Sequence, residues 1–406
     1  MNGIKKNITI KNQIPNFLLK SKSLKKQVKE SSVLIKDIFE NVDDRSDNFS
    51  FLSKNFKLNF KKSDLKRFQK FNTVVVIGMG GSVLASKAIY SFLNHKIKKK
   101  FIFFDNLDEI NTKKILKSKK IKDSLFIIIS KSGNTLETIA NVNLLNIKNF
   151  NKNNTIVITE KRNNAIFNFA KKRKIFFIEH KKFVGGRYSV FTEVGMVPAF
   201  FMGLKIDNFR SNLKKYFKIN KSFLINSVSK ISQIYSQKKF SSLVLLVYCP
   251  HLKEFIAWVQ QLMAESLGKK NMGLMPIISE APKDHHSLLQ LYLDGPRDKL
   301  FYLISGDSPF NLKIKKNYFE YNYNFLKNKK MKKILDEQKN SLAKVLNRKK
   351  IPFREVIVNK LSEKAIGELF AYFILETVLV GKILRVNPFN QPAVEEVKIL
   401  TRKKLF

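Results

Sequence analysis

The sequence predicts an α/β protein with two αβα sandwich units, mainly parallel sheets, an N-terminal helical cap and a C-terminal helical tail. Three observations predict this fold class. Short apolar runs alternate with helical stretches, which is typical of parallel sheets covered on both faces. The alternating series occurs twice, with a polar helical stretch between the two series. The 406 residues are 44% hydrophobic, so the chain can bury one large core or two ordinary ones.

The N-terminal segment, residues 1–70, is rich in Lys, Asn and Ser and contains no recognisable motif. Weak helical spacing of the apolar residues Val33, Ile35, Ile38 and Phe39 predicts a helix. We therefore expect this segment to form a helical cap on the units that follow.

The first unit, residues 71–209, begins where the pattern changes to short β-branched or aromatic runs. Each run has the length of a strand and precedes a helical stretch. Because the runs are continuously apolar, helices should cover both faces of their sheet. The predicted strands are Thr73–Ile77, Phe101–Phe104, Leu125–Ile129, Thr155–Ile158 and Ile175–Ile178.

The second unit, residues 210–385, repeats this pattern after a polar helical stretch around residues 212–237. Direct sequence repetition between the units is too faint to establish, so the duplication is inferred from the pattern alone. The predicted strands are Ser242–Tyr248, Met275–Ser279, Leu300–Ile304 and Phe353–Val358. The predicted helices include Lys253–Leu267, Ser341–Arg348 and a long helix from Glu363 to near Gly381.

The last segment, residues 386–406, is expected to be a tail. Pro388 breaks the helical pattern, because the residue before a proline is disfavoured in the helical region. A final helix is predicted over Ala393–Leu405.

The charge balance is strongly basic. Lys and Arg total 77 against 32 Asp and Glu, a formal net charge of +45, and the lysines are spread almost end to end. Nucleic-acid readers usually concentrate charge on one face and rely on arginine. We therefore expect no nucleic-acid partner, and a solvated surface or a compositional bias explains the charge. A second interpretation is electrostatic capture of an anionic small substrate, which predicts an on-rate that falls with salt.

The single cysteine and the short apolar stretches predict a cytoplasmic protein with no membrane partner. Cys249 is the single cysteine and follows an apolar run, so a buried reduced thiol is expected. Residues 1–20 carry charge throughout and do not resemble a secretory signal. The apolar stretch from Leu369 to Gly381 is interrupted by Glu376 and is shorter than the ~20 residues of a bilayer span.

Two glycine- and hydroxyl-rich turns carry the first chemical signal. Residues 77–82, Ile-Gly-Met-Gly-Gly-Ser, lie between a predicted strand and a helix that starts near Ser82. Glycine lets backbone N–H groups approach an anion at a helix N-terminus. Alone, this turn fits neither the dinucleotide pattern nor a P-loop, and a turn without ligand explains it equally well.

The second turn, residues 130–135, reads Ser-Lys-Ser-Gly-Asn-Thr and follows the strand Leu125–Ile129. Three hydroxyls, one lysine and a glycine at a helix start suit an anion, although plain N-capping would use the same residues. Ligands of open α/β sheets bind outside the carboxyl ends of the strands, where both turns lie. The pair therefore predicts a phosphate site.

This pair of turns resembles the sugar isomerase domain, a phosphosugar-binding α/β fold, and further motifs resemble the phosphoglucose isomerase family. Together the motifs span residues 74–398, and this coverage makes the resemblance specific. The further motifs are Val184–Ser189 (Val-Gly-Gly-Arg-Tyr-Ser), Gln261–Lys269, Asp284–Gln290 and Asn387–Glu395 with Lys398. Leu267 and Ala393 depart from the family pattern, and the first 70 residues match poorly.

The resemblance implies that an aldose phosphate and its ketose interconvert through a cis-enediolate. Glu265 matches the carboxylate that carries a proton between C1 and C2. Its apolar neighbours Trp258, Val259 and Leu262 independently suggest partial burial, although a surface glutamate is the alternative. Arg187 matches the arginine that stabilises the enediolate charge, a role that suits a permanent cation.

The remaining site residues also follow from the resemblance. His286 and Lys398 match the residues assigned to sugar-ring opening, and Gln261 and Gln391 match glutamines near the sugar. The matched phosphate-binding residues are Gly81, Ser82, Ser130, Lys131, Ser132 and Thr135. Metal binding by the adjacent pair His285 and His286 is the competing idea, but no ligand cluster at metal spacing supports it.

The resemblance further implies a sugar phosphate as substrate, no cofactor, no metal, and a homodimer with shared active sites. The expected reaction interconverts glucose 6-phosphate and fructose 6-phosphate. One alternative is a bifunctional phosphoglucose/phosphomannose isomerase. Another is a non-catalytic phosphosugar-binding regulator, which needs the phosphate site but no proton-transfer residues.

Overall fold

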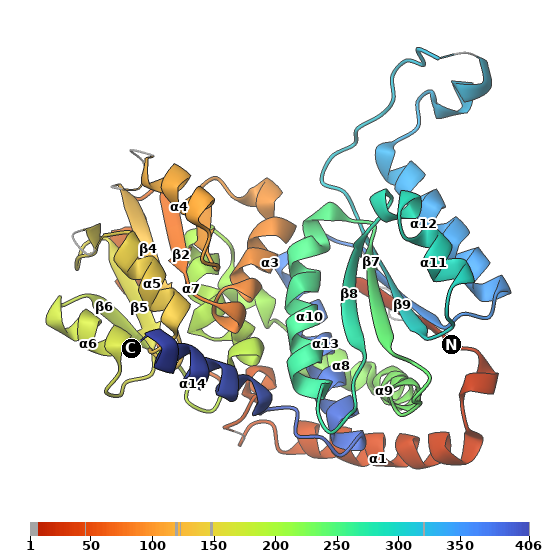
Figure 1. Ribbon diagram of the computed structural model, residues 1–406, viewed down its shortest axis with the longest axis horizontal. Coiled ribbons are helices and arrows are strands. Elements are labelled where there is room, and N and C mark those ends of the chain that lie inside the picture. Colours follow the sequence, from red (N-terminus) through yellow and green to blue (C-terminus); the bar gives the residue numbers. More distant parts are fainter. Residues whose placement is uncertain are drawn as a thin grey trace.

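The computed structural model describes residues 7–44, 46–117, 121, 123–146, 149–319 and 321–405. Figure 1 shows two lobes, each with a β-sheet between layers of helices, in contact through helices that include α3 and α10. The first lobe is drawn in orange and yellow and the second in green and blue. This arrangement confirms the predicted α/β class with two sandwich units. The predicted boundaries after residues 70, 209 and 385 stay a prediction.

The first sheet has the strand order β3-β2-β4-β5-β6, and every neighbouring pair is parallel. All side chains of β2, β4 and β5 are buried, which is why these runs are apolar without alternation. The predicted strands of this unit are thus confirmed to within a residue or two. The strands are β2 (Thr73–Ile77), β3 (Lys100–Phe104), β4 (Ser124–Ile129), β5 (Thr155–Thr159) and β6 (Phe176–Glu179).

Helices cover both faces of the first sheet, and side-chain caps define several of their starts. The Asp108 side chain accepts from the Asn111 N–H, and that of Asn164 accepts from the Phe167 N–H. The helix expected near Ser82 starts two residues later, after a 3₁₀ turn over Gly80–Ser82. The helices are α3 (Leu84–Phe92), α4 (Glu109–Leu116), α5 (Leu136–Leu144), α6 (Ala165–Lys172) and α7 (Glu193–Phe201).

The second sheet has the order β1-β10-β9-β7-β8 and contains one strand that the sequence analysis missed. β1 (Ile8–Gln13) pairs antiparallel with β10, with Ile8 opposite Val358. The expectation of a purely helical segment over residues 1–70 is therefore corrected: its first described residues belong to the second sheet. The parallel strands are β7 (Ser242–Val247), β8 (Met275–Glu280), β9 (Lys299–Gly306) and β10 (Phe353–Val358).

The two sheets share one topology, which supports the inferred duplication. In each, the first parallel strand of the unit (β2 or β7) lies between the next two, and the fourth follows the third. The sheets differ at one edge, where parallel β6 corresponds to antiparallel β1.

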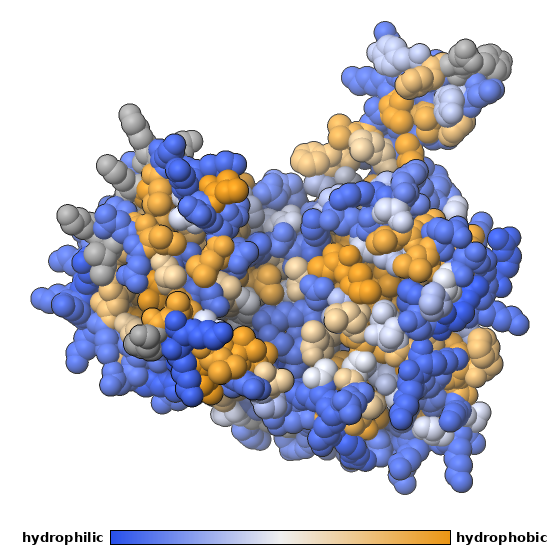
Figure 2. Space-filling model, viewed as in Figure 1, coloured by the Kyte–Doolittle hydropathy of each residue, from blue (hydrophilic) through white to orange (hydrophobic). Residues whose placement is uncertain are grey.

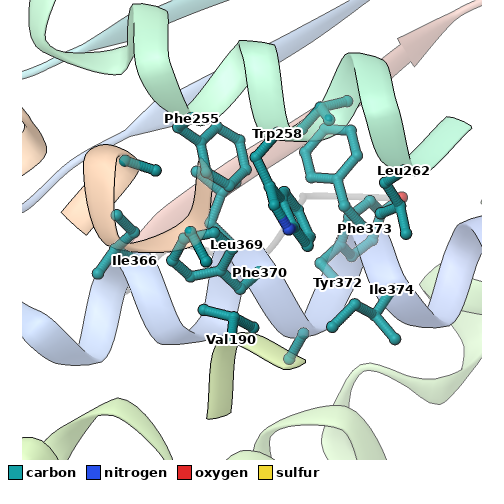
Figure 3. Close-up of a cluster of buried hydrophobic side chains, with 14 of the residues drawn as sticks. Val190, Phe255, Trp258, Leu262, Ile366, Leu369, Phe370, Tyr372, Phe373 and Ile374 are labelled. Carbon is teal, nitrogen blue, oxygen red and sulfur yellow. The ribbon is translucent and has the colours of Figure 1, made fainter. Parts of the chain in front are cut away.

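The helices of the second lobe meet the first lobe around α13. Nearly all of its residues are buried. Figure 3 shows Phe255 and Trp258 of α10 facing Phe370 and Phe373 of α13, and the rings of Trp258 and Phe370 lie 4.7 Å apart, edge to face. Each fully buried ring of this kind contributes roughly 1.5–3 kcal/mol. The remaining helices of the chain are α1 (Ser21–Glu40), α2 (Lys62–Leu65), α8 (Leu213–Ile219), α9 (Lys221–Tyr235), α10 (Lys253–Leu267), α11 (Leu289–Asp294), α12 (Met331–Arg348), α13 (Glu363–Ile383) and α14 (Ala393–Leu405).

An arm over residues 307–319 and 321–330 projects from the second lobe and is seen at the upper right of Figure 1. It carries exposed aromatic side chains, among them Tyr318 and Phe319. Within the described ranges, no helix combines the length and the apolar character needed to cross a bilayer.

Candidate active site

The two predicted anion turns lie at the same edge of the first sheet. β2 and β4 are neighbours, and a side chain added at Gly78 would come within 2.9 Å of the Ile129 carbonyl oxygen. The turns follow these two strands and lead into α3 and α5, so their backbones meet at the carboxyl ends of the strands. This is the edge where open α/β sheets bind ligands.

The hydroxyls of the second turn form one cluster. Thr135 Oγ1 lies 3.0 Å from Ser130 Oγ and 3.4 Å from Ser132 Oγ. Gly133 has φ +67°, and any side chain there would collide with Asn164. Glycine is therefore required for the turn to hold three hydroxyls together at the start of α5.

The Lys131 ammonium points away from this cluster. It donates to the carbonyl oxygens of Lys182 and Val184, at 2.9 Å each. Burial lowers the pKa of Lys131, and Glu160 opposes this effect. Lys131 thus ties the second turn to the loop that leads into Arg187.

The first turn contacts the Arg187 segment directly. A side chain at Gly81 would overlap the backbone of Gly186, so only glycine permits this approach. Gly186 begins a 3₁₀ helix, Gly186–Phe191, that carries Arg187. The backbone of the first turn and Arg187 are thereby placed side by side.

Arg187 is buried and uses all of its guanidinium nitrogens. Nη1 donates to Glu265 Oε2 at 2.8 Å and to Gln391 Oε1 at 2.6 Å. Nε donates to Ser266 Oγ at 2.9 Å, and Nη2 donates to the Pro388 carbonyl oxygen at 2.5 Å. A single arginine therefore joins α10 to the C-terminal segment that precedes α14.

Glu265 is half-buried on the last turn of α10 and has two donors. Arg187 occupies Oε2, and Gln261 Nε2 donates to Oε1 at 2.9 Å. The same Gln261 amide lies against Gly80, where an added side chain would come within 2.7 Å. The carboxylate is thus held in one orientation, beside the first turn, with part of its surface open to a ligand.

Three contributors to this site were not singled out from the sequence. Ser266 Oγ also contacts Tyr188 Oη at 2.7 Å, and Trp258 Nε1 donates to the Arg187 carbonyl oxygen at 3.1 Å. Burial raises the pKa of Tyr188, so its hydroxyl keeps the proton that it donates to the Pro388 carbonyl oxygen. Tyr188 and Ser266 lie inside two of the recognised motifs, and this position was the sequence signal that could have identified them.

A family model described as Phosphoglucose isomerase matches residues 2–279, which is more than half of the chain. The chain belongs to the phosphoglucose isomerase family. The glucose-6-phosphate isomerase of Methanocaldococcus jannaschii is 32% identical over 342 residues, covering 82% of this chain and 84% of that protein. The motifs that contain His286 and Lys398 lie beyond the part matched by the family model.

Solved structures agree with this family member in fold. A hypothetical protein from Thermus thermophilus superposes with a TM-score of 0.83 and 22% identity, covering 98% of this chain and 100% of that one. A glucose-6-phosphate isomerase from Chlamydia trachomatis gives 0.71 and 21%, covering 84% and 71%.

Two predicted catalytic residues of this family member lie apart from the Arg187 cluster. His286 ends the 3₁₀ turn Lys283–His286, and its side chain is exposed. Lys398 is exposed on α14 and pairs with Glu395 at 2.7 Å. In the described parts of the chain, none of the hydrogen bonds and ion pairs of Arg187 and Glu265 involves either residue.

Helix α14 is nevertheless attached to the second turn. Arg402 Nη2 donates to the Asn134 carbonyl oxygen at 2.9 Å. Figure 1 shows α14, in dark blue, lying over the first lobe. Lys398 is thus on a helix that reaches the edge of the sheet where the turns lie.

The second sheet of this family member has a different carboxyl edge. A cavity of about 700 Å³ lies there, lined by Cys249, His251 and Asp307 among others. The last residues that pair with β2 and β7 are Ile128 on β4 and Ile304 on β9. Counting onward from them, Asp307 and Pro309 occupy the places of Lys131 and Gly133. A carboxylate repels phosphate and a proline lacks the N–H donor, so this turn of the second sheet differs from the second turn in two features that suit an anion. Within the described residues, no group of three His, Cys, Asp or Glu side chains is arranged to hold a metal ion.

Proposed function

We propose that this chain is a glucose-6-phosphate isomerase that interconverts glucose 6-phosphate and fructose 6-phosphate through a cis-enediolate. The observation that carries the proposal is the contact between Arg187 and Glu265, at 2.8 Å, beside the first glycine-rich turn. A carboxylate able to move a proton and a permanent cation are then available to the same ligand. The M. jannaschii relative, which is named for this activity, supports the same reaction.

The phosphate of the substrate binds the two turns. The hydroxyls of Ser130 and Ser132 both lie within 3.4 Å of that of Thr135 at the start of α5. Hydroxyl and backbone N–H donors at a helix N-terminus favour an anion. Gly81 and Ser82 of the first turn complete this phosphate site.

Glu265 carries the proton between the two carbons. Its carboxylate removes the proton from C2 of the open-chain aldose, and the electron pair forms the C1–C2 double bond while O1 becomes negative. The hydroxyl proton passes from O2 to O1, and Glu265 returns the first proton to C1. Arg187, fixed by its five hydrogen bonds, stabilises the oxygen charge that develops in between.

His286 and Lys398 open the sugar ring by moving a proton between the ring oxygen and the C1 hydroxyl. The exposed position of His286 favours its donation to the site of a second copy of this chain. We accordingly propose a homodimer with shared active sites. A cytoplasmic location is also proposed, and the buried free thiol of Cys249 supports a reducing compartment.

A coupled assay tests this function. The purified chain is expected to convert fructose 6-phosphate to glucose 6-phosphate at an undiminished rate in the presence of a chelator. Mannose 6-phosphate as a parallel substrate separates the narrow isomerase from the bifunctional enzyme. Tight binding of the sugar phosphate without turnover would overturn the proposal in favour of a non-catalytic sensor.

A further inference from the structure

The helix that carries Glu265 ends two residues after it. α10 stops at Leu267, and the Gly268 N–H still reaches the Ala264 carbonyl oxygen at 3.0 Å. The last carbonyl groups of any helix lack partners within that helix, and unless something binds them the last turn frays. For α10, that last turn contains both Glu265 and Ser266, whose side chains accept hydrogen bonds from the Arg187 guanidinium.

Lys269 binds these carbonyls. Its side chain turns back along the helix and donates from Nζ to the Glu265 carbonyl oxygen at 2.5 Å and to the Ser266 carbonyl oxygen at 2.9 Å. An ammonium group at a helix C-terminus is also favoured by the helix dipole. The backbone of the two site residues is therefore held by one cation.

The backbone of Lys269 is itself fixed by a tight turn. The Met272 N–H donates to the Lys269 carbonyl oxygen at 2.9 Å, and the two residues between them, Lys270 and Asn271, have φ values of +53° and +56°. Two successive left-handed residues define a type I′ turn, which is costly for a residue such as lysine. This turn directs the Lys269 side chain toward α10.

The charged groups that act on Lys269 are Arg187 and Glu265. Burial and the charge of Arg187 together lower the pKa of Lys269 to about 8, and Glu265 opposes them. The ammonium therefore begins to lose its proton within the range in which an enzyme can be assayed.

We propose that Lys269 is a positioning residue of the isomerase site, which holds the last turn of α10 so that Glu265 and Ser266 meet Arg187 in one geometry. The inference rests on the proposed function. A loosened last turn would displace the proton-carrying carboxylate and release the Nε contact of Arg187 together. Displacements of about 1 Å in such an arrangement can lower a rate by ~10²-fold.

The experiment compares three substitutions in the full-length chain. Lys269→Met removes the ammonium and keeps much of the side-chain length, and Lys269→Arg keeps a donor that stays protonated. Lys270→Met is the matched control, because Lys270 is exposed, its Nζ donates to the Arg385 carbonyl oxygen at 3.4 Å, and within the described residues its side chain makes no hydrogen bond to α10. The measurements are kcat and KM between pH 6 and 10, with the thermal unfolding midpoint of each variant.

Lys269→Met is expected to lower kcat by about 10–100-fold and to leave KM within about twofold, because the phosphate turns are untouched. Lys269→Arg is expected to recover kcat to within about fivefold of the unsubstituted chain. The decline of kcat above pH 8 should move to higher pH in Lys269→Arg, a shift that a purely structural role would not produce. Lys270→Met should match the unsubstituted chain.

Two results would overturn the inference. An active chain in which Lys269→Met keeps kcat within twofold would remove Lys269 from the site while leaving the proposed function intact. The same holds if Lys269→Met only lowers the unfolding midpoint and Lys269→Arg keeps the original pH profile. An unsubstituted chain with no isomerase activity would instead overturn the proposed function, and this inference with it.

Discussion

At the scale of single residues, the way in which Glu265 is held leads to a prediction about kcat. Both of its oxygens accept hydrogen bonds, from Arg187 and Gln261; an amide in its place has the same size and keeps one acceptor, but it cannot act as a base. We expect Glu265→Gln to bind sugar phosphate normally and to lose about 10²–10⁴-fold or more in kcat. Steady-state kinetics measure kcat, and titration with a competitive inhibitor measures sugar-phosphate binding.

The control for this variant is Glu254→Gln on the same helix. Glu254 forms an ion pair with Lys87 at 3.4 Å and lines the cavity at the other sheet. Its substitution should leave kcat unchanged. Near-normal turnover of Glu265→Gln would mean that another group carries the proton.

The burial of His180 predicts that the free energy of unfolding falls in acid. Burial lowers the pKa of His180 to about 4; the hydrogen bond with the Lys181 carbonyl oxygen opposes this shift, and the charges of Lys131 and Lys181 add to it. Above pH ~6.5 the ring is neutral in both the folded and the unfolded chain, and its contribution to stability is complete. As the pH falls from 6.5 toward 4, only the unfolded chain takes up the proton, so the free energy of unfolding decreases, by about 2 kcal/mol at pH 5.

His180→Gln should flatten this dependence. The informative quantity is the difference between the two proteins in the shift of the unfolding midpoint from pH 7.5 to pH 5. Equal shifts would show that His180 protonates freely in the folded chain.

Sequence reasoning located residues of this site better than it located their roles. Arg187, Glu265, Gln261 and Gln391 all lie in recognised motifs, and the fold brings them together. The direction of Lys131 could not be read from its motif, because the carbonyl groups that it binds come from a loop about fifty residues away. Contacts of that kind depend on how the strands are ordered in the sheet.

At the scale of elements, a buried ion pair joins β10 to α13. Arg354 is fully buried and donates to both oxygens of Glu376, at 2.6 and 2.8 Å, and also to Ser227 of α9 and Asn12 of β1. Removing one partner leaves the other charge without compensation. We expect Glu376→Leu to lower the free energy of unfolding of the second lobe by about 3–5 kcal/mol, measured by denaturant unfolding.

An exposed pair provides the comparison. Lys333 and Glu337 form an i,i+4 pair on the surface of α12. Glu337→Leu should leave the denaturant midpoint nearly unchanged, because surface pairs of this kind contribute little. Similar midpoints for the two variants would mean that the Arg354 network can rearrange around a lost carboxylate.

β1 was missed because its local sequence pattern is weak. Its apolar residues Ile8 and Ile10 alternate with polar ones, as on a strand with one buried face, but the run is short and lies in a segment rich in Lys and Asn. The parallel strands were recognised because they are continuously apolar. What places β1 is its pairing with β10, more than 330 residues away, and no local pattern reports such a partner.

At the scale of the whole molecule, two sheets of the same strand order end in different side chains at their carboxyl edges. Figure 2 shows hydrophilic side chains over both lobes of the visible face. Under the proposed function, the local donors of the two turns select the phosphate, and the net charge of +45 acts through the long-range electrostatic field.

The position of His286 makes a prediction about assembly. If His286 serves the site of a second copy, a dimer of one Glu265→Gln chain and one His286→Gln chain contains one intact site and one doubly impaired site. The two variants are mixed, their subunits are separated, and they reassociate at random. Half of the dimers are then mixed, so about a quarter of the activity of the unsubstituted chain should be recovered. Each variant carried alone through the same treatment is the control. Activity equal to the mean of the two controls would mean that each chain completes its own site, and the exposed histidine would then have to reach Glu265 by a movement within the second lobe.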